Sequence, residues 1–487
     1  MNIADVVSGR AKLKGTRWVL LSATARKVLA DQLRALLPSG AAVGPCRLRE
    51  ARFEPGRKIT AYYDALVNTD KPERYHVRPI AVTWGSNTDA DRHEETGDLA
   101  KVQAEAVRHG VAAPFLQLMA DSPEWSMRVR VSPLDARFIQ LARLSDPQHV
   151  RAILAEAHAS GNAGSDRRRV SDYNYTITSI KYRPGKRHVL RYDPVDPAKG
   201  GTVFAKLYIG EDGARAFRRE DGARAFRVAQ GVADWLAGHG EGVNGLRPLA
   251  YVAEDAVVLY PQVCGVPLSD YARCPNRVVA RWLQQAGAAL CTLHHLPVAL
   301  AGRPEPHDFA AEIRSIVGKS HHIPVLLPQL ESAIEALFDR AGELHERLPQ
   351  EPPTFTHGDL KTEHMWVAAG GLTVMDFDSS RLADPALDVG YFLADWQFRH
   401  AAYDQAGVDE TYKSFLAGYA AAAPKERLIR ARLYEAVELV KCAVRRMPLF
   451  EQNWASCTAG LVGRAEAVIN DLQRTLGLPA RPLLVHP

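Results

Sequence analysis

A pair of acidic motifs in the last third of the chain constrains the fold most. The first reads HGDLKTEH at residues 357–364, and the second reads VMDFD at residues 374–378. The apolar run at 372–375 predicts a strand that delivers Asp376 at its end. A short loop that follows another strand would aim Asp359 at the same place. One carboxylate could then orient a hydroxyl group while the other chelates Mg²⁺.

Length and composition exclude several classes of protein. The chain has 487 residues, enough for two or three domains, and its 46% hydrophobic and 24% charged residues are ordinary for a globular protein. A net charge of +5 without a clustered basic face argues against a nucleic-acid partner. No apolar run approaches the roughly 20 residues of a transmembrane helix, and residues 1–20 lack the apolar core of a signal peptide. With six cysteines and no C-x-x-C spacing, we expect reduced thiols in a cytoplasmic protein with no membrane partner.

A diverged internal repeat covers the first half of the chain. Residues 53–58 read FEPGRK and residues 182–187 read YRPGKR, and each copy continues to a Tyr-Asp pair, at 63–64 and at 192–193. The offset between the copies stays constant at 129 residues. Both copies predict a β-hairpin closed by a Pro-Gly turn. Coincidence is the alternative, because Pro-Gly turns are common, but the constant offset favours a duplication.

The two copies differ in the strand that follows the hairpin. This strand reads IAVTW at 80–84 in the first copy and VFAKLY at 203–208 in the second. When the two are aligned on their alanines, Val82 stands where the second copy has Lys206. The first copy therefore lacks the lysine, and we interpret it as a non-catalytic cap or docking module.

Changes in composition predict the domain boundaries. The small and polar residues at 158–165 favour a flexible connection. We therefore expect a first domain at 1–150, a linker at 151–167, a second β-rich domain at 168–262 and a domain at 263–480. Apolar residues at three- and four-residue spacing make this last domain mostly helical.

Several motifs together resemble the aminoglycoside phosphotransferase and choline kinase-like family of small-molecule kinases. Besides the two acidic motifs, they are LCTLH at 290–294, ADPALDVG at 383–390 and FLAGY at 415–419. The family commonly has a glycine after the motif histidine, where protein kinases usually have arginine. The resemblance covers about residues 170–450 and implies an α+β, protein-kinase-like bilobal fold with a β-rich N-lobe and a helical C-lobe. Here that fold would be preceded by a diverged, extra N-lobe-like domain.

The resemblance implies roles for the acidic motifs. Asp359 would be the catalytic carboxylate that orients the acceptor hydroxyl and accepts its proton. Asp376 would bind Mg²⁺ between the phosphates of ATP. His364 stands where the family usually has asparagine. It would bind a metal such as Mn²⁺, or hold a metal-bound water, or mark a lost metal site, and a purely structural histidine is equally compatible.

The resemblance also implies a nucleotide site in the second β-rich domain. Lys206 would bind the α- and β-phosphates, with Glu220 as its acidic partner and Glu211 as the alternative. The strand end at Tyr260, Gln262 and Val263 would offer backbone groups to adenine. The hairpin turn would lie over the triphosphate, although a solvent-exposed tip is equally compatible with the sequence; its candidate residues are Arg183, Gly185, Lys186 and Arg187.

These expectations define an ATP-dependent phosphotransferase with Mg²⁺ or Mn²⁺ as its metal. The acceptor would be a hydroxyl of an aminoglycoside, a sugar or an amino alcohol, bound among the helices of 275–350 and 390–450. A nucleotide-binding pseudokinase that docks a protein partner on its first domain is the alternative. A protein kinase is disfavoured, because Asp378 replaces the glycine expected after Asp376-Phe377 and no Ala-Pro-Glu segment follows.

Overall fold

The computed structural model describes residues 2–68, 75–85, 89–161, 174–209, 222–273, 277–301, 304–403 and 408–479. These residues form two compact units. The first unit comprises Met1–Phe226, Pro248–Gln262 and Pro448–Phe450, and the second comprises Arg227–Arg247, Val263–Met447 and Glu451–Pro487. The expected domain at 168–262 is thus divided, because residues 227–247 belong to the helical unit.

The first unit contains two five-stranded antiparallel sheets. The strands of the first sheet are β1 Ala42–Glu54, β2 Lys58–Asn68, β3 Tyr75–Trp84, β4 Met119–Ser122 and β5 Met127–Val131. Those of the second are β6 Tyr175–Arg183, β7 Arg187–Pro194, β8 Val203–Leu207, β10 Ala250–Val252 and β11 Val257–Pro261. Alternation of buried and partly exposed side chains along β2 and β7 explains why these segments form strands that cover a core on one face.

The two sheets have the same topology. The first has the strand order β1-β2-β3-β5-β4, and the second, read from its β6 edge, has the order β6-β7-β8-β11-β10. The register also agrees, because Thr83 pairs with Thr60 and Arg128 while Lys206 pairs with the equivalent residues Val189 and Val258. The predicted duplication, with an extra lobe-like domain in front, is therefore confirmed. The alignment on the alanines is wrong by one residue, because Thr83, and not Val82, occupies the ladder position of Lys206; the first copy still lacks the lysine.

Helices and one shared core complete the first unit. Its helices are α1 Ile3–Val7, α2 Lys12–Leu21, α3 Ala23–Ala35, α4 Asp89–Arg108, α5 Gln140–Arg143 and α6 Pro147–Gly161. The core cluster joins Tyr62 and Ala81 of the first sheet to Tyr182, Leu190 and other residues of the second. Each of these larger apolar side chains contributes roughly 1.5–3 kcal/mol on full burial.

The first part of the expected linker, residues 151–161, is helical in the structure. Helix α6 occupies residues up to Gly161, and its side chains Ile153, Leu154 and Ala157 belong to the core cluster. The polar residues that suggested a flexible connection begin only at the last turns of this helix. Residues 162–167, the rest of the expected linker, lie outside the described residues.

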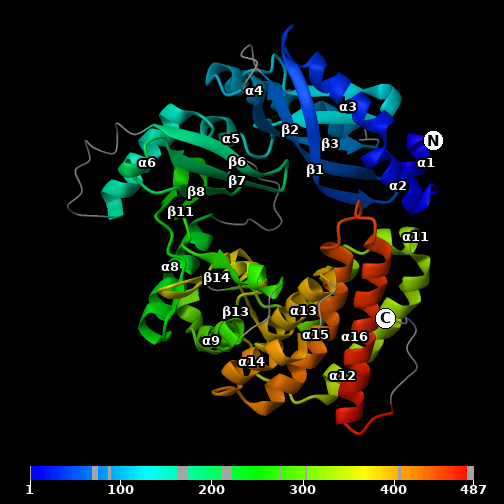
Figure 1. Cartoon of the computed structure of the whole chain (residues 1–487), viewed down its shortest axis with the longest axis vertical. Coiled ribbons are helices and arrows are strands. Elements are labelled where there is room, and N and C mark those ends of the chain that lie inside the picture. The colour runs from blue at the N-terminus through cyan, green and yellow to red at the C-terminus, as the bar shows by residue number, and fades with distance from the viewer. Residues whose placement is uncertain are drawn as a thin grey trace. The chain divides into compact units, whose positions relative to one another are not determined.

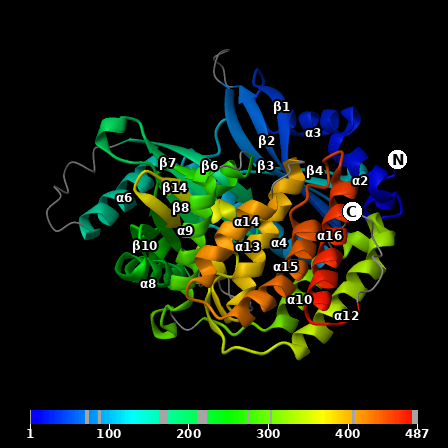
Figure 2. The ribbon, with the colours of Figure 1, turned by 60° about the horizontal axis from the view of Figure 1, so that its bottom comes forward.

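The second unit is mainly helical. Its helices are α8 Gly222–His239, which begins in the first unit, and then α9 Arg277–His294, α10 Phe309–Val317, α11 His322–Leu326, α12 Glu331–Arg347, α13 Ala386–Tyr403, α14 Val408–Ala420, α15 Lys425–Arg445 and α16 Trp454–Thr475. Helix α9 buries Val279, Leu283, Ala286, Leu290 and Leu293, the three- and four-residue spacing expected from the sequence. Helices α15 and α16 run side by side in both views of the ribbon (Figure 1 and Figure 2).

Short strands in the second unit hold the two acidic motifs. They are β9 Val243–Gly245, β12 Val266–Pro267, β13 Thr354–Thr356, β14 Met365–Ala368, β15 Gly371–Val374 and β16 Arg381–Ala383. β14 and β15 form a hairpin between the motifs, in which β15 is the strand expected before Asp376, and β13 pairs with β16. Within the described residues, no helix is long and apolar enough to cross a membrane.

Candidate active site

The first acidic motif forms a loop that is anchored to helix α13. The loop leaves β13, and the backbone N–H groups of His357 and Gly358 donate to the carboxylate of Asp388 at 2.6 and 2.8 Å. Asp388 is fully buried, and its second partner is the ring of His294 at 3.2 Å. Burial raises the pKa of Asp388, but the His294 ring and the backbone N–H groups outweigh it and lower the pKa below its usual range. An ionised carboxylate therefore fixes the start of the loop.

Gly358 is required by this loop. Its backbone has a φ of 73°, which L side chains rarely adopt. A Cβ atom there would lie 2.1 Å from the carbonyl oxygen of Ser379 and 2.5 Å from Nε of Arg381. The glycine of the motif thus lets the loop pass close to the segment before β16.

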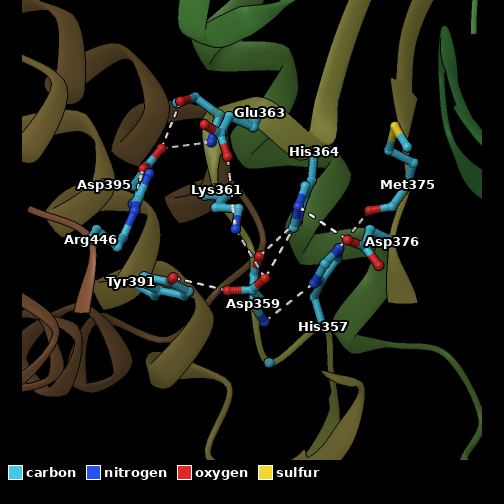
Figure 3. Close-up of polar contacts among 12 residues, drawn as sticks. His357, Asp359, Lys361, Glu363, His364, Met375, Asp376, Tyr391, Asp395 and Arg446 are labelled. Atoms are coloured by element: carbon cyan, nitrogen blue, oxygen red, sulfur yellow. Dashed lines mark hydrogen bonds and ion pairs between the residues drawn. The ribbon is translucent and has the colours of Figure 1, made fainter. Parts of the chain in front are cut away.

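The carboxylate of Asp359 is held by two polar neighbours (Figure 3). The hydroxyl of Tyr391 donates to Oδ1 at 2.9 Å, and Nζ of Lys361 lies 3.2 Å from Oδ2. Burial raises the pKa of Asp359, but the charge of Lys361 and, further away, that of Lys441 contribute to holding it well below its usual range. Asp359 is therefore an oriented, ionised carboxylate that is still partly exposed.

One face of α13 orders the whole loop. Asp388, Tyr391 and Asp395 recur at three- and four-residue spacing, so they lie on the same face of the helix. Asp395 accepts hydrogen bonds from the backbone N–H of Thr362 at 2.8 Å and from its hydroxyl at 2.6 Å, and it also pairs with Arg446 (Figure 3). The sequence carried this signal as three polar residues on a largely apolar helix, but our sequence interpretation did not use it. Lys361 was also missed.

The second acidic motif places Asp376 beside His364. Asp376 lies just after the end of β15. Its φ of 68° is a left-handed conformation that aspartate tolerates better than most residues. Nδ1 of His364 lies 2.9 Å from the carbonyl oxygen of Asp359, and Nε2 lies 3.4 Å from Oδ2 of Asp376 (Figure 3). Burial lowers the pKa of His364 to about 4, so the ring is neutral at physiological pH. A neutral ring that donates from Nδ1 to a carbonyl directs the lone pair of Nε2 towards Asp376.

This donor set fits a divalent cation. Backbone bonding at one ring nitrogen is the usual arrangement of a metal-binding histidine, because it fixes the tautomer and leaves the other nitrogen free to ligate. Within the part of the chain that the structure describes, no group of three His, Cys, Asp or Glu side chains could hold a metal by itself. Any ion at Asp376 and His364 would therefore need further ligands, such as phosphate oxygens or water.

The predicted nucleotide residues are found mainly in the first unit. Lys206 is a buried residue of the central strand β8. Tyr260 lies on β11, and the N–H of Gln262 donates to the carbonyl of Thr202 at 3.0 Å. Val263 is the first residue of the second unit after this strand. Glu220 and its alternative Glu211 lie outside the described residues.

The predicted phosphate turn contacts the first repeat. Arg183 pairs with Glu50, and Nζ of Lys186 lies 4.0 Å from Oε1 of Glu54. The N–H of Gly185, which we expected to be offered to phosphate, instead donates to Asp135 at 2.6 Å. The tip is therefore neither solvent-exposed on all sides nor free to donate its glycine N–H. The fourth predicted residue, Arg187, begins β7.

Residues 196–429 match the model of the phosphotransferase enzyme family. The resemblance seen in the sequence is confirmed over this segment, which is just under half of the chain, and the matched residues include both acidic motifs, α13 and Lys206. The predicted α+β fold is confirmed as well, with a β-rich part before a helical part and an extra, equivalent sheet in front.

Solved structures of phosphotransferases show more distant likenesses to this chain. A choline/ethanolamine kinase family protein from Mesorhizobium loti is 17% identical over 67% of this chain and 98% of its own, with a TM-score of 0.43. A mutant aminoglycoside 2′-phosphotransferase in complex with GDP is 16% identical over 60% and 91%, with a TM-score of 0.42. A thermostable aminoglycoside phosphotransferase in a ternary complex with AMP-PNP and hygromycin B is 13% identical over 61% and 94%, with a TM-score of 0.40. A search of curated proteins found no match.

Proposed function

We propose that the protein is an ATP-dependent kinase that transfers the γ-phosphoryl group to a hydroxyl of a small molecule. An aminoglycoside, another sugar or an amino alcohol is the class of acceptor that suits the family. The observation that carries the proposal is the anchoring of Asp359. Its loop is tied to α13 through Asp388, and its carboxylate is oriented by Tyr391 and Lys361. A partly exposed aspartate with only a structural role does not need hydrogen bonds that fix the direction of its carboxylate. A carboxylate that positions a reacting hydroxyl does need them.

In this proposal Asp359 orients the acceptor and accepts its proton. Because the pKa of Asp359 is held low, the carboxylate is ionised at neutral pH and is a weak base. A weak base suits phosphoryl transfer, whose loose transition state demands positioning more than proton abstraction. The ammonium group of Lys361 lies 3.2 Å from this carboxylate and adds positive charge where phosphoryl oxygens would gather negative charge.

Asp376 and His364 would hold the divalent cation, whose chemistry is to neutralise charge on the phosphates. A carboxylate oxygen suits Mg²⁺, whereas an imidazole nitrogen suits softer ions such as Mn²⁺. Lys206 and the side chains of Arg183, Lys186 and Arg187 would bind the phosphates of ATP, and the strand end at 260–263 would contact adenine. We expect the acceptor among the helices of the second unit.

Acceptor-dependent ADP release tests this function. The purified protein is incubated with ATP and either Mg²⁺ or Mn²⁺, with and without a pool of aminoglycosides, sugars and amino alcohols. The Asp359→Asn variant is the control, because it keeps the shape of the side chain and loses its charge. We expect ADP release that depends on the pool and falls by about 10³-fold or more in the variant. Nucleotide binding without turnover for any acceptor and either metal would favour the pseudokinase instead.

A further inference from the structure

The hairpin turn of the second sheet is held by the segment that follows the first sheet. Both backbone polar groups of Gly185 have partners there. Its N–H donates to Oδ2 of Asp135 at 2.6 Å, and its carbonyl accepts from Nη1 of Arg137 at 3.1 Å. The same Oδ2 lies 2.6 Å from Nε2 of His188, two residues beyond the turn. One carboxylate thus joins both sides of the turn.

This contact is built into the core of the first unit. Asp135 is 1% exposed and His188 is fully buried. The ring of Phe138 packs edge-on against the ring of His188, and the hydroxyl of Tyr182 donates to the carbonyl of Leu134 at 2.6 Å. Hydrogen bonds to a buried carboxylate are among the strongest in proteins, so the turn is fixed from outside its own hairpin.

The equivalent turn of the first repeat lacks this arrangement. The N–H of Gly56 donates to the carbonyl of Val7 at 2.9 Å, a neutral acceptor. Glu54 stands at the position of Arg183, and Thr83 stands at the position of Lys206. The first turn keeps cations at the other two positions, Arg57 and Lys58. The carboxylate anchor therefore accompanies the copy that adds a third turn cation, Arg183, next to a strand with a buried lysine.

We propose that Asp135 is a positioning residue for nucleotide binding, which holds the turn at 183–187 in one conformation so that its basic side chains bind the phosphates of ATP. The proposal rests on the function proposed above. Because the N–H and the carbonyl of Gly185 are already engaged, the turn binds phosphate through side chains. A turn fixed in advance loses less conformational entropy when the nucleotide binds. The segment that follows the first sheet thus supports the nucleotide site without contacting the nucleotide itself.

The dissociation constant of ATP with Mg²⁺, measured by calorimetry on the full-length protein, tests this role. The variant is Asp135→Asn, which keeps the size of the side chain and removes the charge. The matched control is Asp255→Asn. Asp255 is also 1% exposed, and it binds His149 at 2.7 Å and Arg143, so it joins the same part of the chain to the second sheet without any contact to the turn.

We expect Asp135→Asn to raise the dissociation constant about tenfold, the equivalent of one charge-assisted hydrogen bond, and Asp255→Asn to leave it within about twofold. Both variants should lower the melting temperature. Equal weakening by both variants, or no change in either, would overturn the positioning role. Absence of ATP binding by the wild type would instead refute the proposed function.

A second variant serves if Asp135→Asn fails to fold. Arg137 is exposed, so Arg137→Ala should fold, and it removes only the bond to the carbonyl of Gly185. We expect it to raise the dissociation constant about two- to threefold without changing the turnover number, because solvent-exposed bonds contribute little. An unchanged dissociation constant in this variant would also count against the positioning role.

Discussion

A single histidine distinguishes this site from the sequence pattern of its family. The backbone carbonyl of Asp359 fixes the tautomer of His364, and burial keeps the ring neutral, so the ring presents a nitrogen lone pair beside the carboxylate of Asp376. Asparagine at the same position would offer an amide oxygen. In the proposed metal site, histidine would therefore replace a hard ligand with a softer one without changing the charge of the site.

This residue should set the choice of metal. We expect His364→Asn to raise the ratio of the turnover with Mg²⁺ to the turnover with Mn²⁺ by about tenfold, since an oxygen ligand favours Mg²⁺. Steady-state rates at saturating ATP and acceptor would measure the ratio for each metal. His295→Asn is the control, because His295 also bonds to a backbone carbonyl, that of Cys291, but lies directly after α9 and outside the acidic motifs. An unchanged ratio in His364→Asn would assign the histidine a structural role.

Sequence could predict Asp359, Asp376 and His364, because they occur in short motifs. Lys361 lies two residues after Asp359 in the same motif and was overlooked, but sequence could not predict that Tyr391 holds Asp359. The hydroxyl of Tyr391 reaches Asp359 across 32 residues of sequence. Such a contact depends on how α13 packs against the loop, and no local pattern encodes that packing.

At the level of elements, α13 and the loop after β13 act as one body. The helix contributes the acceptors for three backbone N–H groups of the loop, two through Asp388 and one through Asp395. The loop itself contributes a glycine at a φ that other residues avoid. The conformation of the loop therefore depends on both elements.

The glycine provides a direct test of that dependence. We expect Gly358→Ala to lower the free energy of unfolding by about 2 kcal/mol or more and to abolish turnover, since the added Cβ would meet backbone 2.1 Å away at a positive φ. The control is Gly342→Ala in α12, where a Cβ meets nothing within 4 Å. This control should gain about 0.5–1 kcal/mol, because alanine favours a helix more than glycine does. Urea unfolding of both variants measures the effects, and equal signs would contradict the account.

Removing the ion pairs between the two hairpins should change the dissociation constant of ATP in the opposite direction to Asp135→Asn. Glu50 and Glu54 are partly exposed and pair with Arg183 and Lys186, the cations that we propose for phosphate. The double variant Glu50→Gln, Glu54→Gln should lower the dissociation constant of ATP by about two- to fivefold, within the roughly 1 kcal/mol that such pairs contribute. Calorimetry measures it, and raising the salt concentration should shrink the difference.

Glu105→Gln is the control for these pairs. Glu105 forms an ion pair with Arg108 on α4 in the same unit, far along the sequence from either hairpin. Its removal should leave the dissociation constant of ATP unchanged. Weaker ATP binding in the double variant would mean that the two carboxylates support the turn and do not compete with phosphate.

At the scale of the whole molecule, the duplication could be predicted from the sequence, but the contacts between the two copies could not. The constant offset predicted two hairpins with a following strand, and the structure extends the match to all five strands of each sheet. Besides the ion pairs between the hairpins, hydrogen bonds to the second copy come from residues 134–149, which directly precede the expected linker. Helix α6 forms there because Ile153, Leu154 and Ala157 find a core that only the second sheet completes. Long-range burial of this kind leaves no mark in local composition.

Acid should destabilise the second unit between about pH 6.5 and 4. Burial lowers the pKa of His322 and that of His364, each to about 4. In the unfolded chain a histidine has a pKa of about 6.5, so above this pH the ring is neutral in both the folded and the unfolded chain. Between pH 6.5 and 4 the ring is protonated in the unfolded chain but stays neutral in the folded chain. Each histidine therefore removes about 1.4 kcal/mol of stability per pH unit as the pH falls through this window. Burial raises the pKa of Glu438 to about 8. Above about pH 4.5 this carboxyl group therefore makes the folded chain more stable as the pH falls, which offsets the pH dependence of one histidine but not that of both.

The contribution of one histidine can be isolated, because His322 lies apart from the acidic motifs. We expect the free energy of unfolding of His322→Gln to fall less steeply with acidification than that of the wild type, by about 1.4 kcal/mol per pH unit, since glutamine takes up no proton. Urea unfolding at pH 7, 6 and 5 measures the slopes. The control is His76→Gln, whose side chain is exposed on β3 and which should keep the slope of the wild type. If His322→Gln kept the wild-type slope as well, burial would not keep His322 neutral in the folded protein. The acid sensitivity would then have to come from groups nearer the active site.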